Sequence, residues 1–74
     1  MKYNLYTSDS RISDKAELVK TFDYFISVKM FFNKVVNKFK SHEHLGRTIE
    51  DKSHRFTYEF EDGEVIDLFF VEAE

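Results

Sequence analysis

Residues 55–71 read RFTYEFEDGEVIDLFFV and hold the clearest secondary-structure signals in the chain. Aromatic side chains occupy every second position near the start of this stretch, which is the period-two pattern of a half-buried strand. The pair Asp62 and Gly63 predicts a hairpin turn, because glycine adopts a positive φ without strain. The return segment, residues 65–71, is apolar on both of its alternating faces. Strands that are covered on both faces have this composition, so the stretch predicts a hairpin whose second strand is central.

The segment before this hairpin predicts one long helix. Ser13 or Asp14 is expected to begin it by accepting a hydrogen bond from a free backbone N–H, and Glu17 gives Asp14 the spacing of a capping box. No glycine or proline interrupts the chain from there to Lys40. We therefore expect the helix to continue to Lys40 or as far as Gly46, a residue type that commonly follows a helix end.

A short first strand, Lys2 to Thr7, completes the expected fold. A right-handed crossover through the helix places this strand parallel to the first hairpin strand, with the return strand between the two. The fold class is therefore α+β in the order β-α-β-β: one long helix packed on a small three-stranded sheet with a C-terminal β-hairpin. The chain is too short for a second core, so residues 1–74 are expected to form a single domain.

The apolar residues of the expected helix change direction along its length. Placed at about 100° per residue, those up to Ile26 share one side, whereas those from Val28 to Phe39 share another. Three explanations are open: a kink between Ser27 and Lys29, a seam that wraps smoothly around the sheet, and an interface with another chain. The interface is our working hypothesis, because monomers rarely expose a contiguous apolar patch. Its residues are Tyr24, Val28, Phe31, Val35 and Phe39.

Composition supports the same hypothesis. The chain has 74 residues and no cysteine, so neither a disulfide nor a thiolate metal site can stabilise it. Domains this small are marginal and often gain stability by oligomerising. Nine phenylalanines and four tyrosines supply large side chains that bury much area when they pack. We therefore expect a homodimer.

Charge is distributed unevenly along the chain. Residues 1–40 carry eight basic and four acidic side chains, and residues 41–74 carry three basic and ten acidic ones. This pattern is typical of two halves that attract each other in one fold, but it also suits two interaction faces. The acidic face is expected to comprise Glu59, Glu61, Asp62, Glu64 and Asp67, continued by Glu72 and Glu74 in the tail. The basic face is expected to comprise Lys20, Lys34 and Lys38.

Sites for chemistry have little support in the sequence. His42, His44 and His54 are the only ligand-like group, and the first two would point in nearly opposite directions on a helix, so we expect no metal. There is no cysteine nucleophile and no glycine-rich phosphate loop. Lys29 and Asp67 were candidates for a structural ion pair. We expect no cofactor and no enzymatic activity.

The sequence predicts a small interaction protein. It contains no apolar run of the length that a membrane span needs and no secretion signal at Met1, so we expect a cytoplasmic protein that does not bind membranes. It is expected to self-associate and to bind and modulate a larger protein, for example as an inhibitor of the kind that phages and mobile elements encode. Two alternatives are open: a nucleic-acid-binding regulator that uses the lysine face, and an acidic mimic of nucleic acid that uses the hairpin.

Overall fold

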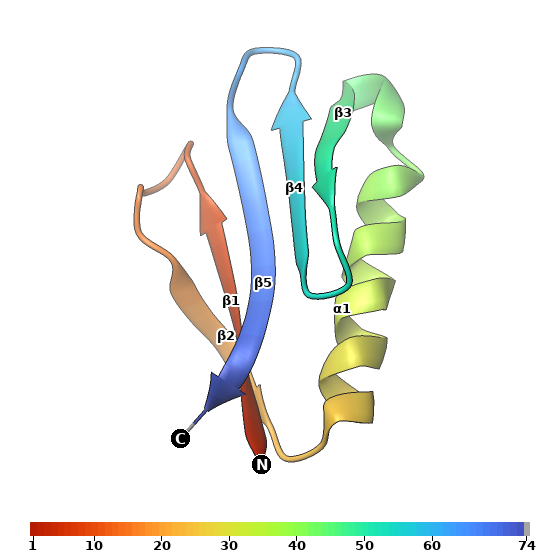
Figure 1. Cartoon of the computed structure of the whole chain (residues 1–74). Coiled ribbons are helices and arrows are strands. Elements are labelled where there is room, and N and C mark those ends of the chain that lie inside the picture. Colours follow the sequence, from red (N-terminus) through yellow and green to blue (C-terminus); the bar gives the residue numbers. More distant parts are fainter. Residues whose placement is uncertain (74) are drawn as a thin grey trace.

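One helix lies on one face of a five-stranded antiparallel sheet (Figure 1). A computed structural model describes residues 1–73. The elements follow the chain in the order β1 (Lys2–Asp9), β2 (Glu17–Phe22), α1 (Phe25–Lys40), a short 3₁₀ helix η1 (Glu43–Leu45), β3 (Gly46–Asp51), β4 (Arg55–Phe60) and β5 (Val65–Ala73).

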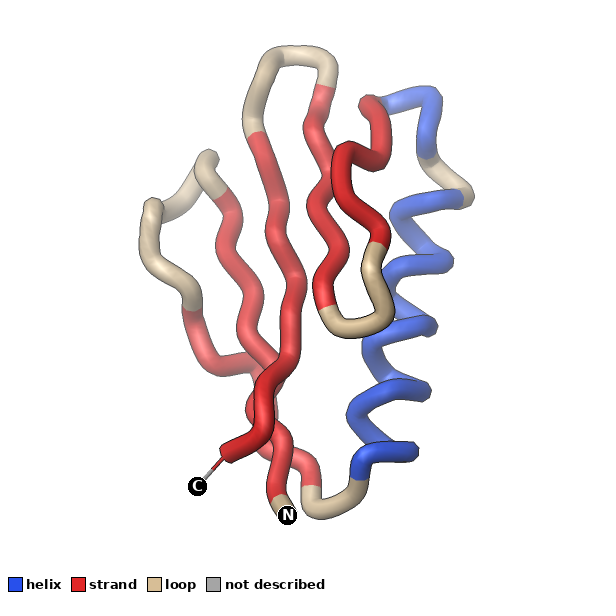
Figure 2. Tube along the Cα trace, viewed as in Figure 1, coloured by secondary structure: helices blue, strands red, loops and turns tan. Residues whose placement is uncertain are grey.

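The strands lie side by side in the order β2-β1-β5-β4-β3 (Figure 2). The hairpin β4–β5 and the central place of β5 between β1 and β4 are as the sequence predicted. Leu68 and Phe70 of β5 are buried under the helix, while Phe69 lies on the opposite face. The α+β class is confirmed, but the sheet has two further strands, one at each edge.

The prediction of a long helix from Ser13 or Asp14 was wrong. Residues 17–22 form β2, an edge strand that among the described residues pairs only with β1, and α1 is 16 residues long. This strand explains why the apolar stripe appeared to turn: Leu18 and Val19 do not belong to a helix at all. The kink considered near Ser27 is absent from α1, which runs unbroken through those residues.

The end of α1 agrees with the nearer of the two predicted ends, but the strand that follows it was not predicted. The helix ends at Lys40, and the chain forms η1 before β3 begins at Gly46. Gly46 is needed for close approach, because a Cβ there would lie 2.1 Å from the backbone oxygen of Glu59 on β4. Gly63 adopts a φ of 89° in the turn between β4 and β5, a conformation that favours glycine.

The core lies between α1 and the sheet. Val28, Phe32 and Val36 occupy one helix stripe at intervals of four residues and are buried. The ring of Phe32 meets that of Phe70 edge-on, with ring centroids 5.3 Å apart, an arrangement that aromatic pairs favour. The sheet contributes the remaining buried residues: Leu5, Phe22, Phe56, Tyr58, Leu68 and Phe70.

Candidate interaction surface

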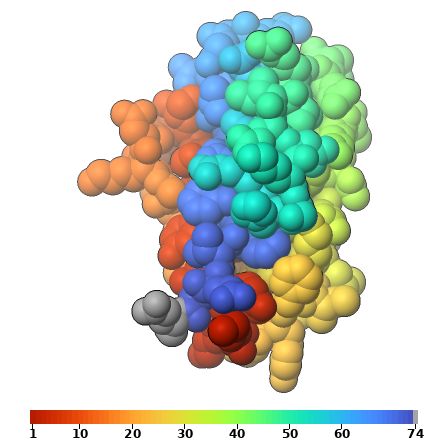
Figure 3. Space-filling model, in the orientation of Figure 1, coloured from red at the N-terminus to blue at the C-terminus, as the bar shows by residue number. Residues whose placement is uncertain are grey.

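Large apolar side chains are exposed around the start of α1 and on strand β2. The exposed set comprises Val19, Tyr24, Phe25, Ile26, Met30 and Phe31. Leu18 is exposed as well, but it lies opposite Tyr6 and therefore on the sheet face that α1 does not cover. The segment that begins α1 protrudes from the body of the molecule, as does the connection between β1 and β2 (Figure 3). We call this set the helix-start surface. Of these exposed residues, the sequence did not predict Leu18, Val19, Phe25, Ile26 and Met30 for the interface. The first four were assigned to the other apolar side of one long helix, and Met30 was not singled out.

The five residues predicted for the interface fall in three different environments. Tyr24 and Phe31 are 70% and 39% exposed and belong to the helix-start surface. The ring of Phe31 lies 5.6 Å from that of Phe22 on β2, which joins the helix part of the surface to the strand part. Val28 is 0% exposed in the core of its own chain, so it cannot contribute to a docking surface in this fold.

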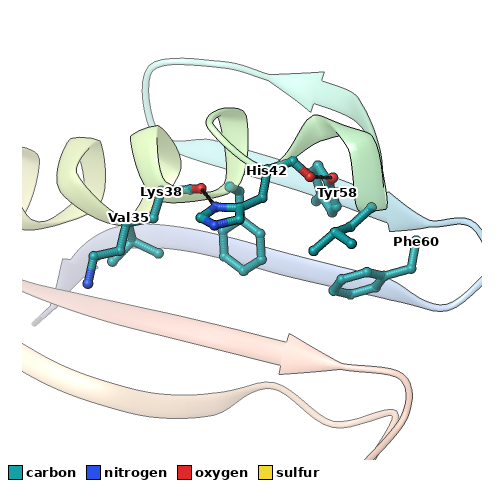
Figure 4. A pocket seen from close by; sticks show the side chains of 7 residues that line it. Val35, Lys38, His42, Tyr58 and Phe60 are labelled. Atoms are coloured by element: carbon teal, nitrogen blue, oxygen red, sulfur yellow. Dashed lines mark hydrogen bonds between the residues drawn. The ribbon is translucent and has the colours of Figure 1, made fainter.

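Val35 and Phe39 are partly buried and pack against the core. They also line an apolar pocket of about 300 Å³ at the C-terminal end of α1 (Figure 4). The wall is completed by Leu45 and by two aromatic residues of β4, Tyr58 and Phe60, with Lys38 and His42 also lining it.

Hydrogen bonds fix the polar groups near this pocket. The Tyr58 hydroxyl donates to the backbone oxygen of His42 at 2.7 Å, and the His42 ring lies 2.8 Å from the backbone oxygen of Lys38 (Figure 4). Burial raises the pKa of Tyr58 above its ordinary value of 10.0, and the carboxylates of Glu43 and Glu61 add to the shift. These contacts fasten η1 to the sheet. The Ser41 hydroxyl lies 3.1 Å from Nδ1 of His42 and donates to the backbone oxygen of Lys38 at 2.8 Å.

The sheet face opposite α1 carries a row of stacked side chains. Tyr6, Phe69 and Arg55 are direct neighbours on β1, β5 and β4. The Tyr6 and Phe69 rings stack at 5.4 Å, and the Arg55 guanidinium lies 4.7 Å from the centre of the Phe69 ring. Arg55 also donates to both carboxylate oxygens of Asp67, at 3.2 and 2.5 Å, and this hydrogen bonding raises the pKa of Arg55. Thr57 donates to Asp67 as well.

The predicted acidic face is divided by the fold. Glu59 pairs with Arg47 at 3.0 Å, and Asp67 is held by Arg55. Glu64 accepts a hydrogen bond from Ser10. The turn itself carries Glu61 and Asp62, and Glu74 lies outside the described residues. The carboxylates therefore do not form one continuous row.

The predicted basic face is divided as well. Lys34 and Lys38 are exposed on α1. Lys20 lies on strand β2, with its ammonium group 5.2 Å from the centre of the Phe22 ring. The three arginines, Arg11, Arg47 and Arg55, each pair with a carboxylate. The pairing of Arg11 lowers the pKa of Asp9 through a side-chain hydrogen bond.

The histidines are not gathered into a site. The rings of His42 and His44 lie 6.0 Å apart near η1, whereas His54 lies in the turn between β3 and β4, at the other end of β3. Residues 1–73 contain no group of three His, Cys, Asp or Glu side chains with metal-binding geometry. Lys29 donates to the backbone oxygen of Ser53 instead of pairing with Asp67.

Within residues 1–73, no helix is long and apolar enough to cross a membrane.

Comparisons with protein-family models, with curated proteins and with solved structures find no match to this chain.

Proposed function

We propose that this chain is a small protein–protein interaction module that self-associates through the part of the helix-start surface that lies along β2 and Phe31. The observation that carries the proposal is the exposure of several large apolar side chains where α1 adjoins the edge strand β2. Apolar area removed from water contributes about 25 cal/mol per Å². A second copy that covered these side chains would add to the stability of a domain with one small core and no cysteine.

The arrangement of charge favours a protein partner over nucleic acid. Phosphate binding rests on basic side chains that are free to pair with phosphate. All three arginines are already paired with carboxylates within the chain, and the predicted lysine face is split between β2 and α1. Mimicry of nucleic acid is disfavoured for the matching reason, because Glu59 and Asp67 are paired internally.

The same module is proposed to bind a larger protein. Ile26 and Met30 lie one turn apart on α1 and are both exposed. They are about 100° or more around the helix from Phe31, which faces β2. A dimer built at β2 would therefore leave Ile26 and Met30 available to another partner. An affinity measurement against an interacting protein, with the Ile26→Asp variant, would test this second contact.

Sedimentation velocity over a range of protein concentrations tests self-association. We expect a dimer for the native chain and a monomer for Phe31→Asp, because the new carboxylate would lose its hydration in the interface. Asn33→Asp is the matched control, since it adds the same charge at an exposed position on the other flank of α1. Tyr24→Asp serves as a second probe, because Tyr24 is more exposed than Phe31. A native chain that stays monomeric at its highest soluble concentration would overturn the proposal.

A further inference from the structure

We propose that two copies of this chain pair through their β2 strands, antiparallel and about a two-fold axis that passes between Leu18 and Val19. This inference rests on the proposed self-association and specifies how it occurs. It joins the two five-stranded sheets into one, because β2 lies at the edge of each. The partner that binds at this edge is therefore a second copy of the chain.

Strand β2 has a free edge. It pairs with β1 on one side, and within residues 1–73 no strand pairs with its other side. An edge strand presents unpaired backbone N–H and C=O groups that another strand can bind. Both Leu18 and Val19 at the middle of β2 are exposed, so pairing would cover apolar side chains as well as backbone.

A bulge in β2 places its two charged side chains on the same face. Glu17 lies opposite Thr7 of β1, and Lys20 lies opposite Leu5, with one extra residue in β2 between these pairs. Thr7 and Leu5 are two residues apart and therefore share a face, which is the face covered by α1 because Leu5 is in the core. In a strand without a bulge, residues three apart would lie on opposite faces.

Only one antiparallel register of two β2 strands matches these charges. With the axis between Leu18 and Val19, Glu17 of each copy lies opposite Lys20 of the other, and Leu18 lies opposite Val19. Opposed residues in an antiparallel pair lie on one face with their Cβ atoms about 5 Å apart. Shifting the register by one residue in either direction places an uncharged side chain opposite Glu17.

The charges of β2 are available for this pairing. Within residues 1–73, no ion pair or side-chain hydrogen bond involves Glu17 or Lys20. An axis perpendicular to the sheet keeps each side chain on its own face, so both helices lie on the same side of the joined sheet. The flank of α1 that carries Phe31 beside Phe22 then faces the axis, and the two helix starts approach each other.

Charge reversal tests the register. Glu17→Lys and Lys20→Glu each place two like charges opposite one another, at both symmetric positions of the interface. We therefore expect each variant to weaken the dimer about tenfold. The double variant Glu17→Lys/Lys20→Glu exchanges the two charges and is expected to return the dissociation constant to within about threefold of the native value. Equal weakening by the double variant would overturn the register. Circular dichroism confirms that each variant is folded.

Cysteine cross-linking gives an independent readout, because the native chain has no cysteine. Glu17→Cys mixed with Lys20→Cys is expected to yield mainly the mixed disulfide under mild oxidation, since these positions face each other. A predominance of either self-linked dimer would contradict the proposed register. If Phe31→Asp dissociates the native dimer while the β2 variants have no effect, self-association stands and pairing through β2 is overturned. If the native chain is monomeric, both proposals fail.

Discussion

The two edge strands of the sheet, β2 and β3, have similar lengths and backbone irregularities but differ in how their charged side chains are paired. Strands β2 and β3 are each six residues long, and within residues 1–73 each pairs with one neighbour only. Each contains one bulge with an extra apolar residue, Val19 in β2 and Ile49 in β3. These two residues are 44% and 48% exposed. Bulges commonly protect edge strands from pairing with other chains, so the local geometry alone does not distinguish the two edges.

The difference lies in what surrounds each edge. On β3, Arg47 pairs with Glu59 at 3.0 Å, and Asp51 pairs with Lys40 of α1 at 2.5 Å. Glu50 pairs with Lys52 in the following turn at 3.2 Å. The charges of β3 are therefore paired with opposite charges of the same chain, whereas within residues 1–73 no ion pair involves Glu17 or Lys20 of β2. The two edge strands thus share a design and differ in whether their charged side chains are paired within the chain.

The largest effect is expected where β3 begins. Gly46→Ala would place a Cβ against the β4 backbone at Glu59, so the strand has to move, and we expect a loss of about 3 kcal/mol in the free energy of unfolding. Gly63→Ala is the control, because nothing lies near its Cβ and only its positive φ is strained, at a cost of about 1 kcal/mol. Chemical denaturation measures both. Equal losses would mean that the approach of β3 to β4 is not tight.

The next effect separates the two edges directly. Val19→Asp should weaken the dimer about thirtyfold, because the carboxylate would be buried opposite Leu18 of the second copy. Ile49→Asp introduces the same charge at the equivalent bulge of β3 and should leave the dissociation constant unchanged. Sedimentation equilibrium of both variants measures this difference. If Ile49→Asp dissociated the dimer and Val19→Asp did not, the interface would lie at β3 and not at β2.

A smaller effect concerns the anchor between η1 and the sheet beside β3. Tyr58→Phe removes the hydrogen bond to His42 and should lower the melting temperature by about 5 °C. The pKa of Tyr58 is raised in the folded chain, so the folded state retains the proton more tightly than the unfolded state. This stabilisation is complete below the unfolded pKa and is lost as the pH rises through the folded pKa. The difference in melting temperature between the native chain and Tyr58→Phe should therefore shrink above about pH 10. Melting curves at alkaline pH measure this difference.

The smallest effect is expected at the ion pair between α1 and β3. Asp51→Asn should cost about 0.5 kcal/mol, because both partners are partly exposed and surface pairs contribute little. Its effect should fade at high salt. A denaturation series at two salt concentrations measures this. New association of Asp51→Asn through β3 would indicate that internal ion pairing prevents this strand from binding a second copy.

The β4–β5 hairpin and the central place of β5 could be predicted because their signals are local. Alternating aromatic residues, a turn glycine and an apolar return strand each act within a few positions. Residues 17–22 could not be assigned in the same way. Leu18, Val19 and Phe22 are spaced as on a helix and also suit an edge strand, and only pairing with β1 selects the strand.

The interface prediction likewise has one part that follows from the sequence and one part that depends on the fold. The sequence indicated that the helix carries more apolar side chains than a small sheet would cover, and Tyr24 and Phe31 are indeed exposed. It could not show that Val28 belongs to the core, because the direction of the helix stripe depends on where the helix begins. Starting at Phe25 instead of Asp14 turns Val28, Phe32 and Val36 toward the sheet.

The sequence by itself determined the α+β class, the hairpin and the excess of apolar side chains, because these follow from composition and short-range periodicity. The tertiary structure alone decided which strands form the edges, which charges are paired and which apolar residues are left exposed. Those outcomes depend on contacts between residues far apart in the chain, such as the pairing of β1 with β5 and the hydrogen bond from Ser10 to Glu64. Pairing energies of that kind are not encoded in the spacing of any one segment.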